Sequence, residues 1–361
     1  MSREPEIDAL RRQIDKLDAE LLALVNRRVD LAKTVGEIKT RGNDPVIYRP
    51  EREAKILGRI ANLNKGPLST EQIERLFREI ISLCRGAEAK PQVATLGPAG
   101  TYSELATVQH FGQEIDIVLT PTIEEVFRTT EADAAQYAVV PVENSTEGGI
   151  GNTMDRLLST PLTICGEIDF RVRHCLLGNS QTTKPKYLYA HQQALSQCRL
   201  WIDSNLPGVK LHPTASNAEA ARLTAGDRNA TAIASAEAAE AYGLAILHRN
   251  IEDQPGNSTR FLVLGHRPVD QTGEDKTSVA MSVRNQPGAL HALLAPLSNN
   301  RIDLTKVESR PSRTGLWEYI FFIDFDGHLD DQTVAKTLTE IESHAAMFKV
   351  LGSYPKSSGL K

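Results

Sequence analysis

The sequence predicts a multidomain protein in which three fold classes follow one another. A heptad spacing of apolar residues predicts an all-α three-helix domain over residues 1–90. Strand and helix patterns alternate over residues 92–268, which predicts an α/β domain with two lobes and a cleft between them. Residues 276–355 follow the order βαββαβ, which is the order of a ferredoxin-like α+β domain.

The composition excludes several classes of protein. The chain has 361 residues, of which 40% are hydrophobic and 24% are charged, as in ordinary globular proteins. Its net charge of −5 provides no basic excess for binding nucleic acid or an acidic membrane. The N-terminal sequence MSREPEID lacks the apolar core of a signal peptide, and no uninterrupted apolar stretch is long enough to span a bilayer. We therefore expect a cytoplasmic protein.

The four cysteines indicate neither disulfides nor a metal site. Cys84, Cys165, Cys175 and Cys198 form no C-x-x-C pair and no metal-binding spacing with histidine. A reducing compartment and buried thiols fit this pattern. We expect no metal and no cofactor.

The first predicted helix carries a heptad seam that one charged residue interrupts. The apolar residues of the seam are Ile7, Leu10, Ile14, Leu17, Leu21, Leu24, Leu31, Val35 and Ile38. A helix of roughly 35 residues is about 50 Å long, more than a small domain spans, so the seam predicts a dimer. Arg28 occupies one seam position, and a buried cation there must be paired or bind an anionic ligand. A coiled coil with one polar residue that sets its register is the alternative.

Two further helices complete this segment. Pro50 suits the first turn of the second helix. Ser69 and Gln72 form a capping box at the start of the third. On the third helix, Glu88 lies one turn beyond Cys84 on the apolar face. A frayed, solvated glutamate is the alternative interpretation of Glu88.

The helical segment resembles the all-helical chorismate mutase family over residues 5–90. The segments LRRQID, NRRVDLA and PERE carry the resemblance, and its inward-pointing cations are Arg11, Arg28, Lys39 and Arg52. The resemblance implies an intertwined dimer whose cations hold the two carboxylates of chorismate while it rearranges to prephenate. This rearrangement needs no nucleophile, because it requires a reactive conformer and stabilised charge at the breaking ether oxygen.

The same resemblance implies roles for particular residues. Lys39 and Glu88 contact the ether oxygen, and Glu53 binds the substrate hydroxyl group. Glu88 must be protonated to donate a hydrogen bond. Arg49 stands where many members of the family carry an acid, and Cys84 stands where some carry a hydroxyl group. An alternative is therefore an impaired mutase domain that is used for dimerisation.

A strand that ends in polar residues organises the α/β domain. Apolar residues lead into the sequence PVENSTEGGIGNTMD at residues 141–155, which turns polar at Asn144 and Ser145 and restarts as a helix. Open α/β sheets place their ligands at the C-terminal ends of their strands. A second polar cluster, NSTRF, occupies residues 257–261. A turn followed by a helix cap is the alternative for the first segment.

Two predicted helix starts in this domain favour the binding of an anion. The GPAGT loop at residues 97–101 precedes a helix with Ser103 at its N-cap, and Ser216 opens another helix. The loop lacks the G-x-G turn of a dinucleotide fingerprint. An ordinary helix cap is the alternative at both places. His174 lies in an apolar context, so we expect it to have a structural or lining role.

Five motifs in order resemble those of the prephenate dehydratase family. They are GPAGTYSE, PVENSTEGG, DFRVRHCLL, HPTASNAEAA and NSTRFLVL. The resemblance implies loss of CO₂ and water from prephenate, for which the protein supplies anion binding and a donor to the departing hydroxide. It implies that Thr259 is the essential residue. The expected substrate contacts are Thr101, Asn144, Ser145, Ser216, Thr259, Arg260 and Phe261, and a structural ion pair is the alternative for Arg260.

The C-terminal segment resembles the ACT domain that is fused to these dehydratases. Its two signatures are NQPGALH at residues 285–291 and ESRP at residues 308–311. The resemblance implies that phenylalanine binds between paired domains and inhibits the enzyme. Gly288 would let the backbone approach the ligand, whose carboxylate the helix amides would receive. The implied contacts are Asn285, Pro287, Gly288, Ala289, Leu290, Glu308, Ser309, Arg310 and Pro311.

Together the three resemblances imply a bifunctional enzyme of phenylalanine biosynthesis. It would convert chorismate to prephenate and prephenate to phenylpyruvate, under feedback inhibition by phenylalanine. We expect a homodimer or a dimer of dimers. The alternative from another class is a non-catalytic protein that binds an anion or an amino acid, because two-lobed α/β folds also serve as solute receptors.

Overall fold

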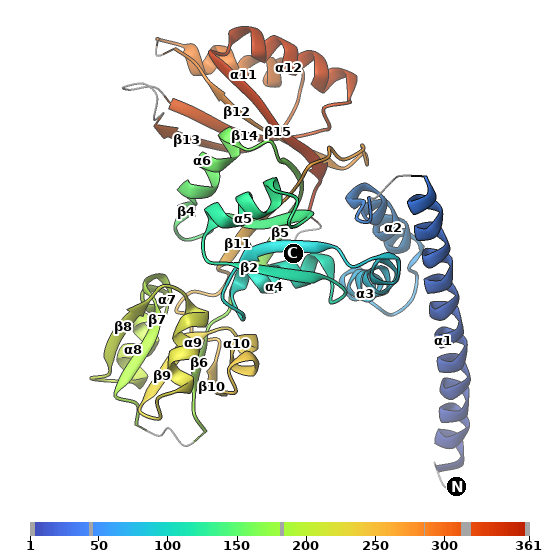
Figure 1. Cartoon of the computed structure of the whole chain (residues 1–361), viewed down its shortest axis with the longest axis vertical. Helices are drawn as coiled ribbons and strands as arrows, with labels where there is room; N and C mark the ends of the chain where they lie inside the picture. The colour runs from blue at the N-terminus through green and yellow to red at the C-terminus, as the bar shows by residue number, and fades with distance from the viewer. Residues whose placement is uncertain (1–3, 43–45, 181–183, 285, 312–318, 358–361) are drawn as a thin grey trace. The chain divides into compact units, whose positions relative to one another are not determined.

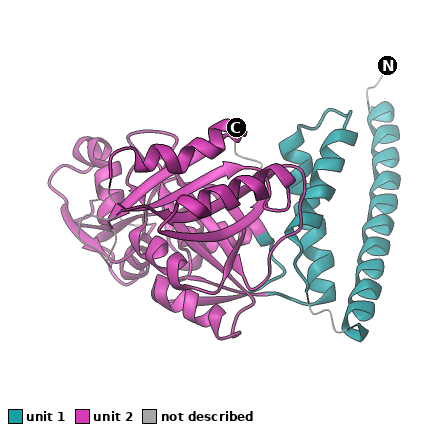
Figure 2. Cartoon of the chain, turned by 90° about the horizontal axis from the view of Figure 1, so that it is seen from above, with its two compact units in different colours: residues 1–91, 111–116 teal, residues 92–110, 117–361 magenta. Residues whose placement is uncertain are grey.

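The structure is a computed structural model that describes residues 4–42, 46–180, 184–284, 286–311 and 319–357 (Figure 1). These residues divide into two compact units, drawn teal and magenta in Figure 2. The first unit holds residues 1–91 and 111–116, and the second holds residues 92–110 and 117–361. Asn285, which the sequence analysis assigns to the phenylalanine site, lies outside the described residues.

The first unit contains the predicted helices. They are α1 (Glu4–Arg41), α2 (Pro50–Leu63) and α3 (Thr70–Glu88). Pro50 is the first residue of α2, as predicted. The capping box is also present, because the Ser69 hydroxyl accepts from the Gln72 N–H at 3.2 Å and Gln72 Oε1 accepts from the Ser69 N–H at 2.9 Å.

The apolar seam of α1 is uncovered in the single chain. Its residues are between 46% and 62% exposed, and they are Ile7, Leu10, Ile14, Leu17, Leu21, Leu24, Leu31, Val35 and Ile38. Gly36, by contrast, is buried, because α3 passes so close that a Cβ atom here would collide with the Glu88 side chain. An apolar stripe of this length needs a covering surface.

One lobe of the second unit is built on a mixed sheet. Its strands are β1 (Gln92–Leu96), β2 (Asp116–Thr120), β3 (Tyr137–Asn144), β4 (Gly148–Gly149), β5 (Thr163–Arg171) and β11 (Ser258–Gly265). Their order is β2-β1-β3-β11-β5, with β4 paired to β3. β3 is parallel to β1, and β11 is antiparallel to both of its neighbours. The helices of this lobe are α4 (Tyr102–Phe111), α5 (Ile123–Glu131) and α6 (Gly151–Ser159).

The second lobe is inserted between β5 and β11, which are neighbours in the first sheet. Its sheet has the order β10-β6-β9-β7-β8. The strands are β6 (Cys175–Gly178), β7 (Tyr187–His191), β8 (Lys210–Thr214), β9 (Ala230–Ala234) and β10 (Ala245–Arg249). The helices are α7 (Gln192–Gln197), α8 (Arg199–Asn205), α9 (Asn217–Ala225) and α10 (Ala236–Ala241). The chain therefore crosses between the lobes at the ends of two paired strands.

The C-terminal segment has the predicted order of elements. They are β12 (Asp275–Ser282), α11 (Ala289–Asn299), β13 (Leu304–Pro311), β14 (Tyr319–Asp326), α12 (Gln332–His344) and β15 (Met347–Pro355). The strands form an antiparallel sheet with the order β13-β14-β12-β15. Helices α11 and α12 pack on one face of this sheet, as Figure 1 shows.

The other face of the C-terminal sheet shares a hydrophobic core with the first lobe. Ala280, Phe322 and Leu351 of the C-terminal sheet pack in one cluster with Val140 and Leu262 of β3 and β11. Strand β15 also approaches β5 directly, since the Thr163 hydroxyl donates to the Leu351 carbonyl oxygen at 3.1 Å. The C-terminal sheet is thus a layer of the second compact unit, although the sequence analysis treats it as a domain of its own.

The sequence analysis placed several helices and strands but missed others. The strand that leads into the polar residues Asn144 and Ser145 is present as β3, and the helix predicted after it is present as α6. Strand β9 escaped prediction because its sequence, ATAIA, is small and weakly apolar. Strand β8 escaped because it is mostly exposed at the edge of its sheet. No helix among the described residues is long and apolar enough to cross a membrane.

Candidate active site

The two polar clusters that the sequence analysis singled out meet on neighbouring strands. β3 and β11 run antiparallel, and Asn144 lies opposite Thr259 while Glu143 lies opposite Arg260. Thr259 and Asn144 are both buried, with 8% and 7% of their surface exposed. The four residues thus form two adjacent rungs of one ladder. We call Asn144 and Thr259 the inner rung and Glu143 and Arg260 the outer rung.

A register shift in the ladder decides which way Asn144 faces. Ala138, Val140 and Val142 of β3 are buried in the core shared with the C-terminal sheet. Strict alternation would turn Asn144 towards the same face. The ladder shifts its register just before the outer rung, so that Asn144 pairs with Thr259 instead. Bulges of this kind re-aim side chains near active sites.

Hydrogen bonds fix the orientation of the Asn144 amide. Its Nδ2 donates to Thr259 Oγ1 at 2.8 Å and to Asn257 Oδ1 at 3.1 Å. Its Oδ1 accepts from the N–H of Thr146 at 3.1 Å and from the Thr146 hydroxyl at 2.6 Å. Because Thr259 Oγ1 accepts from Asn144, the hydroxyl hydrogen of Thr259 can be donated to a substrate atom.

Ser145 belongs to the same network. Its hydroxyl donates to Asn257 Oδ1 at 3.2 Å and accepts from the N–H of Ser258 at 3.0 Å. The first residues after β3 are therefore tied to the first residues of β11. Asn144, Ser145 and Thr259, which the sequence analysis predicted as a group, are brought together by these bonds.

Gln197 reaches the network from the second lobe, and the sequence analysis missed it. Its Oε1 accepts from Asn257 Nδ2 at 3.0 Å and from His174 Nε2 at 2.9 Å, while its Nε2 donates to Thr146 Oγ1 at 2.7 Å. The side chain therefore connects α7 to both polar clusters. In the sequence it lies in a helical stretch without a recognisable motif. Only the packing of the two lobes gives it a partner.

His174 and Tyr102 extend this network away from Thr259. The Tyr102 hydroxyl lies 3.0 Å from His174 Nδ1 and donates to the Arg173 carbonyl oxygen at 2.7 Å. Burial lowers the pKa of His174, although the hydrogen bond to Gln197 opposes this effect. Burial also raises the pKa of Tyr102. Both side chains are therefore neutral at pH 7, and His174 has the lining position that the sequence analysis expected.

Thr101 and Ser216 serve as helix caps. The Thr101 hydroxyl accepts from the N–H of Glu104 at 3.3 Å and donates to the Leu96 carbonyl oxygen at 2.7 Å. Ser103 lies inside α4, so its prediction as the N-cap is wrong. Ser216 is the N-cap of α9, and its hydroxyl accepts from the N–H of Glu219 at 3.0 Å. The network around Thr259 forms without either residue.

Arg260 and Phe261 do not join the network. Arg260 Nε donates to Glu167 Oε2 at 2.9 Å and its Nη1 donates to Asp324 Oδ2 at 2.6 Å. The structure therefore favours a structural ion pair, the alternative interpretation of Arg260. Phe261 is 1% exposed and packs edge-on against Phe170, with ring centroids 6.5 Å apart. Arg260 faces the side of the sheet opposite to Thr259, because successive residues of a strand alternate. Phe261 lies on the same side as Thr259, but its ring is buried against Phe170.

The helical unit brings Lys39 and Glu88 together. Lys39 Nζ donates to Glu88 Oε1 at 2.7 Å and to the Val46 carbonyl oxygen at 3.1 Å. The pair is largely buried, with side chains 21% and 13% exposed. The absence of a side chain at Gly36 permits the close approach of the two helices. An ion pair is the arrangement of a charged Glu88, whereas the sequence analysis expected a protonated one.

Arg28 and Cys84 also meet between α1 and α3. Arg28 Nη1 lies 2.7 Å from Cys84 Sγ and 3.4 Å from the Ile80 carbonyl oxygen. Cys84 is buried, with 5% of its surface exposed. The Cys84 thiol thus lies directly beside the guanidinium group of Arg28. Arg28 and Lys39 therefore both point from α1 towards α3.

Glu53 pairs with an arginine that the sequence analysis missed. Arg85 on α3 forms a salt bridge with Glu53 and donates to the Phe111 carbonyl oxygen. The Arg85 side chain is 4% exposed and lies over the rings of Tyr48 and Phe111, at 5.4 and 5.6 Å from their centroids. A substrate hydroxyl group would therefore approach a carboxylate that Arg85 already holds.

The remaining predicted cations of this unit lie further out. Arg11 is exposed and lies 3.2 Å from Asp8 on its own helix. Arg52 is exposed on α2, so its predicted inward orientation is wrong for the single chain. Arg49, at the N-cap position of α2, is half-buried. The side chains of Arg11 and Arg52 therefore face solvent in the single chain.

The predicted phenylalanine contacts lie at two places in the C-terminal segment, the start of α11 and strand β13. Gly288 has a φ of 82° and is the N-cap of α11, so the first helix amides point past a residue without a side chain. Pro287, Ala289 and Leu290 flank it. On β13, Ser309 and Pro311 are exposed, whereas Glu308 and Arg310 point towards the first lobe.

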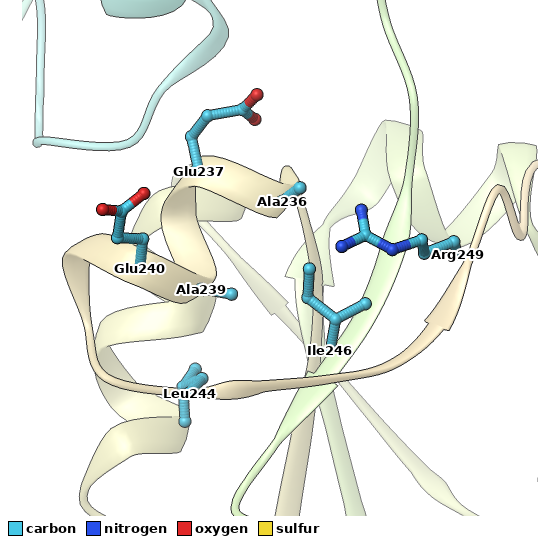
Figure 3. Close-up of a pocket in the computed structure, with 7 residues that line it drawn as sticks. All are labelled: Ala236, Glu237, Ala239, Glu240, Leu244, Ile246 and Arg249. Carbon is cyan, nitrogen blue, oxygen red and sulfur yellow. The ribbon is translucent and has the colours of Figure 1, made fainter. Parts of the chain in front are cut away.

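Other features of the described residues carry no site. The four cysteines are buried and form no disulfide among these residues, and no group of His, Cys, Asp and Glu could hold a metal. An open pocket between α10 and β10 is lined by Glu237, Glu240 and Arg249 (Figure 3). Its lining includes none of the predicted site residues.

Three family models match successive parts of the chain. The models are chorismate mutase type II at residues 10–89, prephenate dehydratase at residues 93–269 and the ACT domain at residues 277–343. The bifunctional chorismate mutase/prephenate dehydratase of Pseudomonas aeruginosa is 47% identical over 363 residues, which cover 99% of this chain and 100% of that protein. The chain belongs to the bifunctional chorismate mutase/prephenate dehydratase family. The three resemblances that the motifs predicted are therefore confirmed.

Solved structures agree with this family for the dehydratase and ACT parts. A prephenate dehydratase from Arthrobacter aurescens in complex with L-Phe has a TM-score of 0.69 and 31% identity, covering 73% of this chain and 90% of that one. A protein described as a novel type of quorum-quenching acylase has a TM-score of 0.68 and 31% identity, covering 74% and 98%. The two-lobed α/β fold with an attached C-terminal sheet is thus shared with these proteins.

Proposed function

We propose that residues of the two compact units carry the two activities of this family separately. The helical unit would rearrange chorismate to prephenate. The two-lobed part of the second unit would convert prephenate to phenylpyruvate, and its C-terminal sheet would bind phenylalanine as the feedback inhibitor. The boundaries of these parts follow the predicted domains at residues 1–90, 92–268 and 276–355.

The mutase reaction would use the buried cations between α1 and α3. Arg28 and Lys39 would hold the carboxylates and the ether oxygen of chorismate, whose rearrangement requires no nucleophile. Glu88 would donate to the ether oxygen after it takes up a proton. Arg11, Arg49, Arg52, Glu53 and Cys84 are the further proposed contacts, with Arg11 and Arg52 completed by a second copy across the seam.

The dehydratase reaction would use the inner rung, Asn144 and Thr259. Prephenate loses its ring carboxylate as CO₂, the released electron pair enters the ring, and the ring hydroxyl leaves as water after one proton is taken up. Thr259 would donate its hydroxyl hydrogen to this leaving oxygen, because Asn144 holds Thr259 Oγ1 as an acceptor. Ser145, Thr101 and Ser216 would bind the substrate carboxylates together with helix N-termini.

Phenylalanine would bind at the β13 edge of the C-terminal sheet and at the start of α11. The strand order β13-β14-β12-β15 with two helices on one face supports a ferredoxin-like ACT domain. Exposed Ser309 and Pro311 on the β13 edge, with Gly288 at the helix start, suit a ligand held between two paired domains. The apolar seam of α1 supports a second contact between copies, so we propose a dimer or a dimer of dimers.

The hydrogen bond between Asn144 and Thr259 is the observation that carries the dehydratase assignment. The test supplies purified protein with chorismate and measures prephenate and phenylpyruvate separately, with and without phenylalanine. Phenylpyruvate formed from chorismate and suppressed by phenylalanine would support all three assignments. Phenylpyruvate formed only from added prephenate would instead show an impaired mutase domain, and no turnover of either compound would favour a binding protein.

A further inference from the structure

The two rungs of the β3–β11 ladder face opposite sides of the sheet. Asn144 and Thr259 hydrogen-bond to one another in the polar network that reaches the second lobe. Glu143 and Arg260, one residue away on each strand, form ion pairs with the C-terminal sheet instead. A displacement of the outer rung therefore moves the inner rung, because Glu143 is bonded to Asn144 and Thr259 to Arg260 through planar peptide units.

Arg260 is the central cation of a buried ion cluster. Its guanidinium group contacts Asp324 of β14 at 2.6 Å, Tyr354 of β15 at 3.0 Å and Glu167 of β5 at 2.8 Å. Lys276 of β12 contacts both oxygens of Glu167 at 2.8 Å. Burial opposes the charge of Arg260, but the surrounding anions outweigh it and raise the pKa of Arg260. The cluster thus joins the strand that bears Thr259 to strands of the C-terminal sheet.

Lys306 of β13 makes the matching contact with the other strand. Its Nζ lies 2.7 Å from Glu143 Oε2 and 3.1 Å from Glu308 Oε2. Glu308 also lies so close to Gly149 that a Cβ atom there would collide with its carboxylate. Lys306 and Glu308 are on the inward face of β13, whose outward face carries the exposed Ser309. Strand β13 thus contacts the loop after Asn144 and also carries exposed residues of the proposed phenylalanine site.

The helix that follows this loop is also held at both ends by the C-terminal sheet. Arg310 of β13 donates to the Gly151 carbonyl oxygen at the start of α6 and lies 3.5 Å from Asp155. Lys349 of β15 donates to the carbonyl oxygens of Leu157 at 2.8 Å and Thr160 at 2.7 Å, at the end of the helix. Residues on both sides of the loop between β3 and α6 are therefore bound to the C-terminal sheet.

We propose that Lys306 and Asp324 are positioning residues of the dehydratase site, which act through Glu143 and Arg260. They hold the outer rung, and so set the orientation of Asn144 and Thr259 without touching the substrate. A ligand that shifts β13 would change this orientation. Inhibition would then reach the dehydratase site through the ion pairs Lys306–Glu143 and Asp324–Arg260. The inference rests on the proposed dehydratase site at Thr259.

The test compares Lys306→Met, Glu143→Gln and the double variant, assayed with added prephenate. We expect each single variant to lower kcat roughly ten- to a hundredfold with little change in KM, because misplacement by about 1 Å has effects of this size. The double variant should lose no more than the worse single variant, since the pair acts as one unit. Exchange of the charges in a Lys306→Glu, Glu143→Lys variant should restore part of kcat. A rise in KM at unchanged kcat, or fully additive losses, would overturn the inference.

Two further measurements distinguish a positioning role of Lys306 from a general weakening of the C-terminal sheet. Lys356→Met removes a cation that pairs with Asp326 of the same sheet at 2.7 Å without reaching the ladder, so its kcat should stay at the wild-type value. Phenylalanine should still bind Lys306→Met, measured by calorimetry, while its effect on kcat is lost. Unchanged inhibition would contradict the proposed path. Retained dehydration by a Thr259→Ala variant would instead defeat the proposed site, whatever the Lys306 variants do.

Discussion

Asn144 donates to Thr259 Oγ1 at 2.8 Å across two strands that are far apart in the sequence. This bond assigns the roles of donor and acceptor within the pair, because an amide nitrogen cannot accept. Thr259 is left with its own hydrogen for the substrate. The orientation is a property of the folded ladder and of Thr146, which holds the amide oxygen.

Replacement of the Thr259 hydroxyl tests its role as a donor. We expect Thr259→Val to lower dehydration of prephenate about 100- to 1,000-fold, which is the effect of removing one hydrogen-bond donor from a transition state. Thr259→Ser keeps the hydroxyl and should retain most of the activity. The measurement is phenylpyruvate formation from prephenate, with mutase activity in the same preparation as the control. Equal losses in both variants would argue against the donor role.

Replacement of the Asn144 amide tests the direction of the bond. Asn144→Asp removes the donor, so Thr259 would donate to the new carboxylate and no longer to the substrate. We expect a loss of kcat comparable to that of Thr259→Val, together with a higher KM because prephenate is an anion. Combining Asn144→Asp with Thr259→Val should add little to the loss of kcat. A fully additive result would show that the two residues act independently.

Replacement of Glu88 by glutamine tests its contact with the ether oxygen. The ether oxygen of chorismate accepts a hydrogen bond, and an amide always has a hydrogen to donate whereas a carboxylate has none. We expect Glu88→Gln to retain or raise mutase activity, measured as steady-state rates with chorismate. Loss of activity would mean that the carboxylate is needed to hold Lys39.

The stability of the second unit should depend on His174. Burial lowers the pKa of His174 in the folded chain, whereas the pKa of a histidine in an unfolded chain is about 6.5. Below that pH the unfolded state binds the extra proton, so the free energy of unfolding decreases as pH falls. Urea midpoints at acidic and neutral pH should differ less for His174→Asn than for the wild type. His212→Asn, at an exposed ring on β8, is the control.

The exposed seam of α1 should hold copies of the chain together. Leu21 is 58% exposed, and its replacement by Glu would bury a charge wherever a partner covers the seam. We expect Leu21→Glu to reduce the size of the assembly in sedimentation and to abolish most mutase activity, while dehydration of added prephenate continues. Leu200→Glu, at a residue that is 70% exposed on α8, should change neither property. An assembly of unchanged size would exclude the seam as an interface.

Two polar segments beside apolar stretches indicated where Asn144 and Thr259 lie, and the resemblance to the dehydratase family singled out Thr259. The sequence did not indicate the direction in which Arg260 points, since residues 261–264 are apolar on both faces of β11 and leave the alternation unmarked. No motif in the sequence marked Gln197 or Arg85 as a candidate site residue. Each acquires its partners only when distant segments pack, Gln197 across the two lobes and Arg85 against the segment around Phe111. The local spacing of residues does not predict contacts that form only when distant segments pack together.

The hydrophobic core that the C-terminal sheet shares with β3 and β11 makes this sheet a structural part of the dehydratase unit. Phe322 and Leu351 cover Val140 and Leu262, so deletion of the sheet would leave an apolar surface in water and remove the partners of Arg260. Gene truncation would thus destroy the catalyst along with its regulator. Single substitutions around Ser309 or Lys306 are instead expected to weaken inhibition by phenylalanine while they leave this layer of the fold intact.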